Sequence, residues 1–371
     1  MKIGIPTELK NSERRVAITP EGVDALARRG HDVLIEKGAG AGARVPDEAY
    51  VAAGARVSAS ADDIWEHGDL LLKVKEPIAP EFSRMRADQV LFTYLHLAAS
   101  VECANALLQA GTTAIAYETV QTADRKLPLL APMSEIAGRL SVLAGAHHLM
   151  SPLGGRGTLL GGIAGARAAK VVVLGGGVAG EHAIRNAVGM GADVTVLDLS
   201  LPRLRELQAE FGPALRTRVS TPLEIAAQVS EADLVIGAVL VPGATAPRLV
   251  TTDMVATMPE GSVLVDIAID QGGCFEGSKP TTYSDPTFAV HSSQYYCVAN
   301  MPGAVPETAT RALTNATLPY VIALAERGWR AAVRTDPALA AGLNTHAGLV
   351  TNAPVAAALG TQFVAPTDLP V

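Results

Sequence analysis

A short apolar run with three consecutive β-branched valines, Lys170–Leu174, leads directly into a glycine-rich turn. The turn has the spacing G-x-G-x-x-G, formed by Gly175, Gly177 and Gly180, and the helix-like segment Glu181–Ala187 follows it. The first glycine permits a tight turn, the second lets a pyrophosphate approach the backbone, and the third lets helix and strand pack closely. Phosphates then bind the free N–H groups at the start of the helix. The pattern predicts a dinucleotide-binding βαβ unit, whereas the glycine spacing alone would be compatible with an ordinary tight turn.

An acidic residue follows at the position where such units bind a ribose. Gly191 ends the helix, and the next expected strand ends at Asp198, which lies 18 residues after Gly180. A carboxylate there accepts hydrogen bonds from ribose hydroxyls and repels a 2′-phosphate, so the sequence favours NAD over NADP. Arg203 lies nearby in the sequence, and its positive charge would tolerate a phosphate, which leaves the degree of preference open.

Apolar strands alternate with helix-like segments in two series. The first series of expected strands comprises Lys2–Pro6, Asp32–Glu36, Leu70–Lys75, Val90–Leu95 and Thr113–Tyr117. The second series comprises Lys170–Leu174, Val194–Asp198, Asp233–Val239, Val263–Ile269 and Tyr296–Ala299. Longer helices are expected from Ser134 to Met150 and from Pro306 to Arg327, followed by a tail interrupted by Pro and Gly.

This order of elements predicts an α/β fold with two Rossmann-like, doubly wound parallel sheets. We expect the NAD-binding Rossmann domain, 131–305, to be inserted in a discontinuous substrate (catalytic) domain made of 1–130 and 306–371. A linear division into two domains fits the same pattern, so both arrangements stay open at this point.

Composition excludes several classes of protein. Hydrophobic residues make up 49% of the 371 residues and charged residues 18%, which excludes a disordered chain. The net charge of −7 and the lack of a Lys/Arg run argue against a nucleic-acid partner. The N-terminus MKIGIPTELK lacks the apolar core of a signal peptide, and the uncharged stretch Pro286–Pro306 is too polar for a membrane helix. Three widely spaced cysteines indicate neither zinc nor disulfides, so we expect a cytoplasmic protein.

Four polar side chains stand where apolar strands stop, and ligands of open α/β folds bind at the carboxyl ends of strands. Lys75 and His96 end two strands of the first series, Arg15 follows the first strand, and Asp270 ends a strand of the second series. Arg and Lys together suit a small anionic substrate, and His suits proton transfer near neutral pH.

Each of these four residues also has a structural interpretation. Lys75 and Arg15 could be ordinary surface charges, His96 a hydrogen-bonded interior group, and Asp270 the start of a turn. Their coincidence at four strand ends, beside a dinucleotide motif, favours the functional interpretation. The residues alone therefore predict an NAD-dependent oxidation of a small 2-hydroxy or 2-amino acid.

Longer motifs resemble those of the bacterial-type alanine dehydrogenases, and the resemblance extends over nearly the whole chain. The segments that carry it are Ile3–Glu8, Glu13–Ala17, Lys73–Pro77, Tyr94–Ala98, Pro132–Gly138, Asp266–Gly273, Val298–Gly303 and Asn315–Tyr320. The resemblance implies reversible oxidative deamination of L-alanine to pyruvate and ammonium, with NAD as cofactor. It also implies that the protein is a homo-oligomer, namely a hexamer.

The resemblance also implies roles for individual residues. Arg15 and Lys75 bind the carboxylate and carbonyl of pyruvate, His96 is the general acid/base, and Asp270 is the second catalytic group. The implied cofactor contacts come from the glycine turn and from residues scattered along the second series: Ser134, Gly175, Gly177, Val178, Ala179, Gly180, Asp198, Arg203, Ser220, Val239, Leu240, Ile267, Lys279, Val298, Asn300 and Met301. Ser134 is also expected to cap the helix that it begins.

One departure from the family concerns a metal. Some members bind magnesium through an acidic residue and a His in the last long helix, but Ala323 and Arg327 stand there, so we expect no metal. Two related activities remain as alternatives. One is the soluble NAD-binding component of a proton-translocating transhydrogenase, and the other is a saccharopine- or opine-type dehydrogenase.

Overall fold

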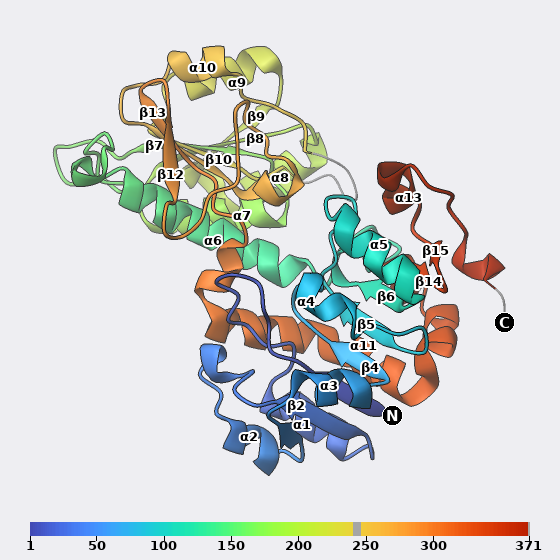
Figure 1. Cartoon of the computed structure of the whole chain (residues 1–371). Helices are drawn as coiled ribbons and strands as arrows, with labels where there is room; N and C mark the ends of the chain where they lie inside the picture. Colours follow the sequence, from blue (N-terminus) through green and yellow to red (C-terminus); the bar gives the residue numbers. More distant parts are fainter. Residues whose placement is uncertain (240–245, 370–371) are drawn as a thin grey trace. The chain divides into compact units, whose positions relative to one another are not determined.

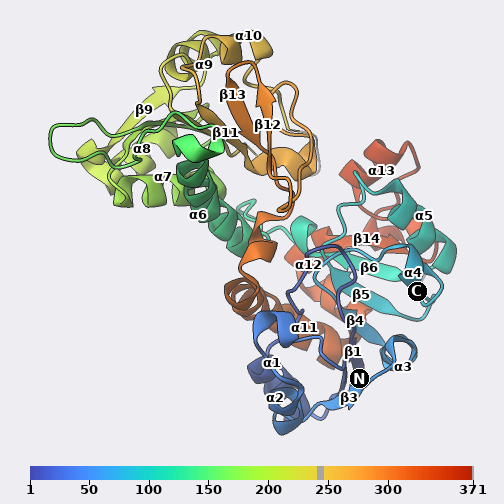
Figure 2. The same cartoon turned by 60° about the vertical axis from the view of Figure 1, so that its left-hand side comes forward.

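The structure of the protein is a computed structural model that describes residues 1–239 and 246–369. The chain divides into two compact units (Figures 1 and 2). The first unit consists of Met1–Met133 and Gly303–Val371, and the second of Ser134–Pro302. Each unit is built around one mostly parallel sheet.

The sheet of the first unit has the strand order β15-β14-β6-β5-β4-β1-β2-β3. Its strands are β1 (Lys2–Ile5), β2 (Asp32–Glu36), β3 (Arg56–Ser58), β4 (Leu70–Leu72), β5 (Val90–Thr93), β6 (Thr113–Ala116), β14 (Leu343–His346) and β15 (Leu349–Val350). The first six strands are parallel, and the last two close one edge in antiparallel pairing. The order reverses between β1 and β4, which is the point where doubly wound sheets bind ligands.

Helices lie on both faces of this sheet (Figures 1 and 2). They are α1 (Pro20–Ala27), α2 (Asp47–Ala52), α3 (Ala61–His67), α4 (Ala79–Phe82), α5 (Val101–Ala110), α11 (Pro306–Thr335), α12 (Pro337–Gly342) and α13 (Ala353–Leu359). Short 3-10 turns are η1 (Ala41–Ala43), η2 (Tyr117–Thr119) and η7 (Pro366–Asp368). Helix α11 contains a non-helical residue, Gly328 (φ 71°), where its direction changes.

The sheet of the second unit has the order β12-β13-β11-β10-β7-β8-β9. Its strands are β7 (Lys170–Leu174), β8 (Asp193–Asp198), β9 (Leu215–Val219), β10 (Leu234–Gly237), β11 (Val263–Asp266), β12 (Thr287–Val290) and β13 (Ser293–Tyr296). Only β12 pairs antiparallel among these described strands. The order reverses between β7 and β10, and the glycine turn begins directly after β7.

The helices that accompany this sheet are α6 (Ala131–His148), α7 (Val178–Gly189), α8 (Leu201–Phe211), α9 (Pro222–Val229) and α10 (Thr252–Ala256). The 3-10 turns are η3 (Ser151–Leu153), η4 (Gly212–Ala214), η5 (Ile267–Gln271) and η6 (Met301–Ala304). Along β7, Val171 and Val173 pack with α7, whereas Val172 and Leu174 pack in a second cluster with α9 and α10. Burial on both faces explains why the strand is continuously apolar.

Both sheets confirm the predicted fold class of two Rossmann-like α/β sheets. Several predicted strands were too long. In two of them, a carboxylate side chain accepts the backbone N–H groups at the point where the strand was expected to continue. Strand β4 ends at Leu72 because the N–H groups of Val74 and Lys75 donate to the Glu8 carboxylate instead of a neighbouring strand. Strand β11 ends at Asp266, whose side chain caps the following 3-10 turn. The last predicted strand of the second series was misplaced, because β13 ends at Tyr296.

Two further expectations were wrong. Helix α6 begins at Ala131, so Ser134 lies inside the helix and does not cap it. Pro132 is tolerated in the first turn because the N–H group that it lacks would have no intrahelical partner there. The segment after Arg327 is not a tail, because it contains β14, which pairs with β6 and completes the first sheet.

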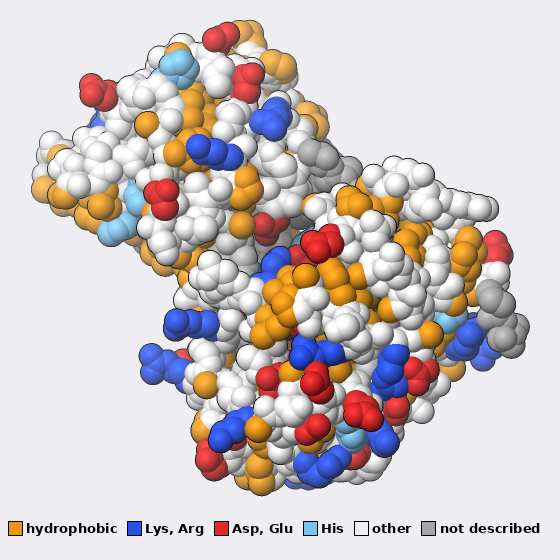
Figure 3. Space-filling model, in the orientation of Figure 1, with side chains coloured by type: hydrophobic (Ala, Val, Ile, Leu, Met, Phe, Trp, Pro, Cys, Tyr) orange, Lys and Arg blue, Asp and Glu red, His pale blue; other side chains and the backbone are white. Residues whose placement is uncertain are grey.

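Charged side chains of both signs are interspersed on the face of the first unit that Figure 3 shows. No helix of the described residues is long and apolar enough to cross a membrane.

Candidate functional site

The glycine turn has the geometry of a phosphate-binding turn. Gly175 has a φ of 96°, and a Cβ on Gly180 would lie 1.8 Å from the Gly175 carbonyl oxygen. Both positions therefore require glycine. A Cβ on Gly177 would meet nothing within 4 Å, so open space borders the turn at the start of α7. Helix α7 has no side-chain N-cap, which leaves its first N–H groups to an anion.

Asp198 closes the end of β8 against this turn. Its Oδ2 accepts the N–H group of Gly176 at 2.7 Å, and its Oδ1 accepts the N–H group of Ser200 at 2.7 Å. Arg203 donates from Nε to the Gly176 carbonyl oxygen at 2.6 Å. The predicted ribose-binding carboxylate and the predicted cation thus lie on either side of one residue of the glycine turn.

Most of the other predicted cofactor residues follow the carboxyl ends of parallel strands of the second sheet. Ser220 follows β9, Val239 follows β10, Ile267 follows β11 and Val298 follows β13. Parallel strands carry their carboxyl ends at one edge, so these segments share the edge of the glycine turn. Val239 lies close to the turn, with its Cγ2 3.0 Å from a Cβ placed on Gly175.

The remaining predicted contacts have varied surroundings. Val178 is exposed and Ala179 is partly buried in the first turn of α7, and Ser134 is partly buried in α6. The ammonium of Lys279 lies over the Phe288 ring, 4.6 Å from its centre. Asn300 has a φ of 61° next to the buried Met301. Leu240 lies outside the described residues.

Asp270, predicted to end a strand, lies instead in the 3-10 turn η5 and is exposed. The buried Asp266 holds this turn, because its Oδ1 accepts the Ala268 N–H group at 3.1 Å. Its Oδ2 accepts the N–H group of Cys274 at 3.0 Å and the hydroxyl of Ser278, next to Lys279, at 2.6 Å. Burial raises the pKa of Asp266, although these hydrogen bonds oppose the shift. From the sequence, Asp266 was predicted only to lie in a strand, and its role in holding this turn was missed.

In the first unit, Glu8 spans the point where the strand order reverses. It follows β1, and its carboxylate accepts the N–H groups of Val74 at 2.6 Å and of Lys75 at 3.3 Å, which follow β4. The buried Lys73 pairs with Glu8 at 3.3 Å and with Glu81 at 2.8 Å. Burial lowers the pKa of Lys73, but these two carboxylates raise it more, so the ammonium stays charged.

Lys75 is held by its backbone and not by its side chain. It is only 8% exposed, yet its ammonium has no carboxylate within ion-pair distance among residues 1–239 and 246–369. A largely buried cation without a counter-ion is costly unless an anion binds it. This arrangement favours the functional interpretation of Lys75 over that of a surface charge.

His96 follows β5 and adopts a left-handed backbone conformation, with φ of 48°. Glu118, which follows the neighbouring β6, accepts the His96 N–H group at 2.7 Å and the Leu95 N–H group at 3.2 Å. The imidazole lies parallel to the Tyr94 ring, with 6.0 Å between ring centres. Its two nitrogens have no hydrogen-bond partner in the described part of the chain, so the ring is available to a substrate.

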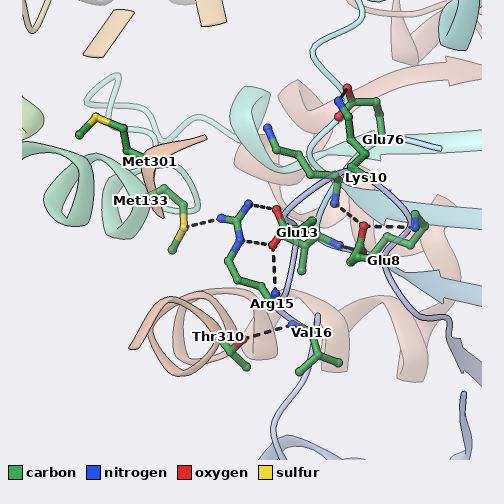
Figure 4. A network of polar contacts seen from close by, with 12 residues as sticks. Glu8, Lys10, Glu13, Arg15, Val16, Glu76, Met133, Met301 and Thr310 are labelled. Carbon is green, nitrogen blue, oxygen red and sulfur yellow. Dashed lines mark hydrogen bonds and ion pairs between the residues drawn. The ribbon is translucent and has the colours of Figure 1, made fainter. Parts of the chain in front are cut away.

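Arg15 lies in the loop after β1 and is 2% exposed (Figure 4). Glu13 accepts two parallel hydrogen bonds from the guanidinium, from Nε at 2.7 Å and from NH2 at 2.5 Å, and fixes its plane. The NH1 group faces the Met133 sulfur at 3.0 Å, and the N–H group of the next residue, Val16, donates to the Thr310 hydroxyl at 3.2 Å. Arg15 is therefore a rigid interior cation and not a surface charge.

Arg15, Lys75 and His96 all belong to loops at the carboxyl edge of the first sheet, whereas Asp270 belongs to the second unit. Glu8 and Tyr94 contact or influence these three residues. Glu8 accepts the backbone N–H group of Lys75, and the Tyr94 ring stacks beside His96. The positive charge of Arg15 acts to lower the pKa of the Tyr94 hydroxyl, although burial raises it more. A cavity of about 380 Å³ opens beside Arg15, but Lys75 and His96 do not line it.

Family models match both halves of the chain. The model described as "Alanine dehydrogenase/PNT, N-terminal domain" matches residues 4–137, and that of the C-terminal domain matches residues 141–353. The chain belongs to the alanine dehydrogenase/PNT family. Alanine dehydrogenase of Mycobacterium tuberculosis is 61% identical over 369 residues, which cover 100% of both chains. This assignment confirms the resemblance drawn from the motifs.

Solved structures of this family share the fold. An L-alanine dehydrogenase structure superposes with a TM-score of 0.92 at 51% identity, covering 97% of this chain and 99% of that one. A transhydrogenase from Sinorhizobium meliloti superposes with a TM-score of 0.79 at 29% identity, covering 95% and 99%. Both structures thus have this fold, and the chain has more sequence in common with the L-alanine dehydrogenase.

Proposed function

We propose that the protein is an alanine dehydrogenase that converts L-alanine, NAD and water reversibly into pyruvate, ammonium and NADH. The observation that carries this proposal concerns two side chains that follow β4 and β5. Within the described residues, the Lys75 ammonium has no ion-pair carboxylate and the His96 imidazole nitrogens have no hydrogen-bond partner. Full-length similarity to alanine dehydrogenases supports the same substrate. A transhydrogenase component would have no need of a buried cation for a small anion beside a proton acceptor.

The second unit fits NAD. The turn at Gly175, Gly177 and Gly180 provides the close backbone approach, and the uncapped start of α7 offers N–H groups for the pyrophosphate. Asp198 keeps a lone pair on each carboxylate oxygen for the ribose hydroxyls, since each oxygen accepts only one backbone N–H group. The scattered contacts predicted from Ser134 to Met301 remain part of this proposal.

In the proposed mechanism, Arg15 binds the carboxylate of the substrate, and Lys75 binds the carbonyl oxygen of pyruvate. When held by the glycine turn and Asp198, NAD would supply the acceptor for the hydride that leaves Cα with the C–H electron pair. His96 takes a proton from the ammonium group of alanine and releases it to solvent, which frees the nitrogen lone pair for the C=N bond. Asp270 orients the water that adds to this carbon, while His96 removes one water proton and returns it to the nitrogen. The C–N bond then breaks with its electron pair on nitrogen, His96 takes the hydroxyl proton as the C=O bond forms, and ammonia leaves.

The proposal is tested by following NADH oxidation with pyruvate in the presence and absence of ammonium. We expect oxidation only when both are present. Glyoxylate with ammonium and 2-oxoglutarate with lysine serve as comparison substrates. Activity with 2-oxoglutarate and lysine, and none with pyruvate and ammonium, would assign the protein to the saccharopine-type enzymes and refute the proposal.

We also propose that the protein is a homo-hexamer, as the family resemblance implied. Exposed apolar side chains near the glycine-rich loop support a subunit contact, among them Leu143 (49% exposed), Leu159 (65%) and Ile163 (70%). The apolar helical segment Leu313–Leu324 of α11 is unsuitable for this contact, because Leu313 and Leu324 are buried within the chain itself. Light scattering of the purified protein measures the subunit number, and a monomer would refute this state.

A further inference from the structure

Arg203 stands where a cation could receive the 2′-phosphate of NADP. A Cβ placed on Gly176 would lie 3.3 Å from the Asp198 carboxylate and 3.5 Å from Cγ of Arg203. The ribose-binding carboxylate and this cation therefore border the same residue of the glycine turn. The sequence alone could not decide whether Arg203 offsets the discrimination that Asp198 provides.

The structure shows every nitrogen of the Arg203 guanidinium engaged. Its Nε donates to the Gly176 carbonyl oxygen at 2.6 Å, its NH1 donates to Glu206 at 2.9 Å, and its NH2 pairs with Glu181. Glu206 lies one turn further along the same helix, α8, whereas Glu181 lies in the first turn of α7. Two carboxylates thus neutralise one guanidinium and hold it against the turn.

We propose that Glu181 and Glu206 determine the coenzyme preference by holding Arg203 in two ion pairs, so that it cannot receive a 2′-phosphate. This inference rests on the proposed NAD-dependent function. To reach a phosphate, Arg203 would have to leave Glu181, and Glu181 would remain beside the incoming charge and repel it. Discrimination between NAD and NADP then depends on three carboxylates. Asp198 binds the ribose, and Glu181 and Glu206 restrain the Arg203 guanidinium.

The electrostatics agree with this geometry. Arg203 and Glu181 are 27% and 22% exposed at their side chains, so solvent screens their pair less than a pair on an open surface. Burial acts to raise the pKa of Glu181, but the hydrogen bond and charge of Arg203 lower it further, so its pKa lies below the usual value. Glu181 therefore keeps its negative charge near neutral pH.

The test compares binding of NADH and NADPH to the intact protein by coenzyme fluorescence, which needs no turnover. In Glu181→Ala we expect the ratio of the NADPH to the NADH dissociation constant to fall about tenfold, the effect of one charge-assisted hydrogen bond. The double variant Glu181→Ala/Glu206→Ala falls further. Alanine is a strong helix former, so both helices should persist.

Glu210→Ala is the matched control, because Glu210 lies in the last turn of the same helix α8 and forms an ion pair with Arg185. The ratio of its NADPH to its NADH dissociation constant should equal that of the unmodified protein. Adding Arg203→Gln to Glu181→Ala should cancel the gain in NADPH binding, since the released guanidinium is its source.

An unchanged ratio in both glutamate variants would overturn the inference, and so would a gain that persists without Arg203. These outcomes leave the proposed function intact as long as the unmodified protein binds NADH. An unmodified protein that binds neither coenzyme would overturn the proposed function, and this inference with it.

Discussion

The Glu118 carboxylate accepts the backbone N–H group of His96 at 2.7 Å, across the ends of two neighbouring strands. His96 needs this contact because its left-handed backbone conformation costs about 1–2 kcal/mol for a residue with a Cβ. Glu8 makes the equivalent contact to the backbone of Lys75. Lys75 and His96 are therefore each positioned by a carboxylate that follows an adjacent strand of the sheet.

We expect Glu118→Ala to lower kcat about 10- to 100-fold, because the His96 loop loses the acceptor that fixes the imidazole. Binding of NADH, measured by fluorescence, should stay unchanged, since Glu118 belongs to the other unit. Glu118→Gln keeps one oxygen acceptor for the His96 N–H group and should recover part of kcat. Glu102→Ala, on the exposed face of α5, is the control for a lost carboxylate. Equal kcat values for Glu118→Ala and Glu102→Ala would show that Glu118 positions nothing.

His96→Ala and Asp270→Ala should each lose turnover by about 100- to 10,000-fold, the usual contribution of a general acid or base. NADH binding should survive in both, because neither substitution removes a group from the glycine turn. Steady-state kinetics and a fluorescence titration on the same preparations separate the two effects. If either variant kept near-normal turnover, its assigned role would be wrong.

Two glycines of the cofactor turn should fail differently when replaced by alanine. Gly180→Ala places a Cβ 1.8 Å from the Gly175 carbonyl oxygen, so we expect a loss of stability of about 1–3 kcal/mol or more. Gly177→Ala meets no atom within 4 Å and has an ordinary φ of −65°, so it should fold normally. Its methyl group occupies the space through which the pyrophosphate approaches, and NADH binding should weaken about tenfold or more.

Gly189→Ala is the control for these two variants, because Gly189 ends α7 with open space around it. It should unfold in urea no earlier than the unmodified protein and bind NADH equally well. A Gly177→Ala protein with undiminished NADH affinity would argue against a phosphate at this turn.

His346 should make the protein less stable in mild acid. Its Nδ1 lies 2.9 Å from the Thr113 hydroxyl and its Nε2 lies 3.4 Å from the Arg330 guanidinium, which can only donate. Burial first, and then the charge of Arg330, lower the pKa of His346 below its usual 6.5. The unfolded chain therefore binds a proton at a pH where the folded protein does not, so the free energy of unfolding falls as the pH drops below about 6.5.

Urea unfolding of His346→Asn at pH 7.5 and pH 5.5 measures this contribution. Asparagine cannot titrate, so the loss of stability between the two pH values should be smaller than in the unmodified protein. Two other histidines, the buried His148 and the partly buried His182, also have pKa values that burial lowers, so they will retain part of the slope. An unchanged slope would mean that His346 is protonated in the folded state.

The sequence predicted what depends on local pattern. Strand β2 has the predicted bounds Asp32–Glu36, and the glycine turn lies where the motif placed it, because apolar runs and glycine spacing are local signals. Edge strands such as β9, with its exposed arginines, lacked that apolar signal and were missed. Strand β14 was hidden in a stretch that looked like a tail, since only pairing with β6 makes it a strand.

For the candidate site, the sequence proposed the contact residues but not the residues that hold them in place. Lys75 and His96 stood out because a polar residue ends an apolar run. Glu8 and Glu118 did not, because their partners lie 67 and 22 residues away and only the parallel sheet brings them together. Asp266 was read as part of a strand, since nothing in the local sequence shows that its carboxylate holds the turn of Asp270.

The pairing of β14 with β6 also has a consequence during synthesis. The sheet of the first unit is complete only when residues 343–350 have left the ribosome, whereas all of the second unit emerges by residue 302. Since domains generally fold as units during translation, the second unit can fold while the first is still unfinished. Until translation passes residue 350, β6 exposes an unpaired edge that other chains could join.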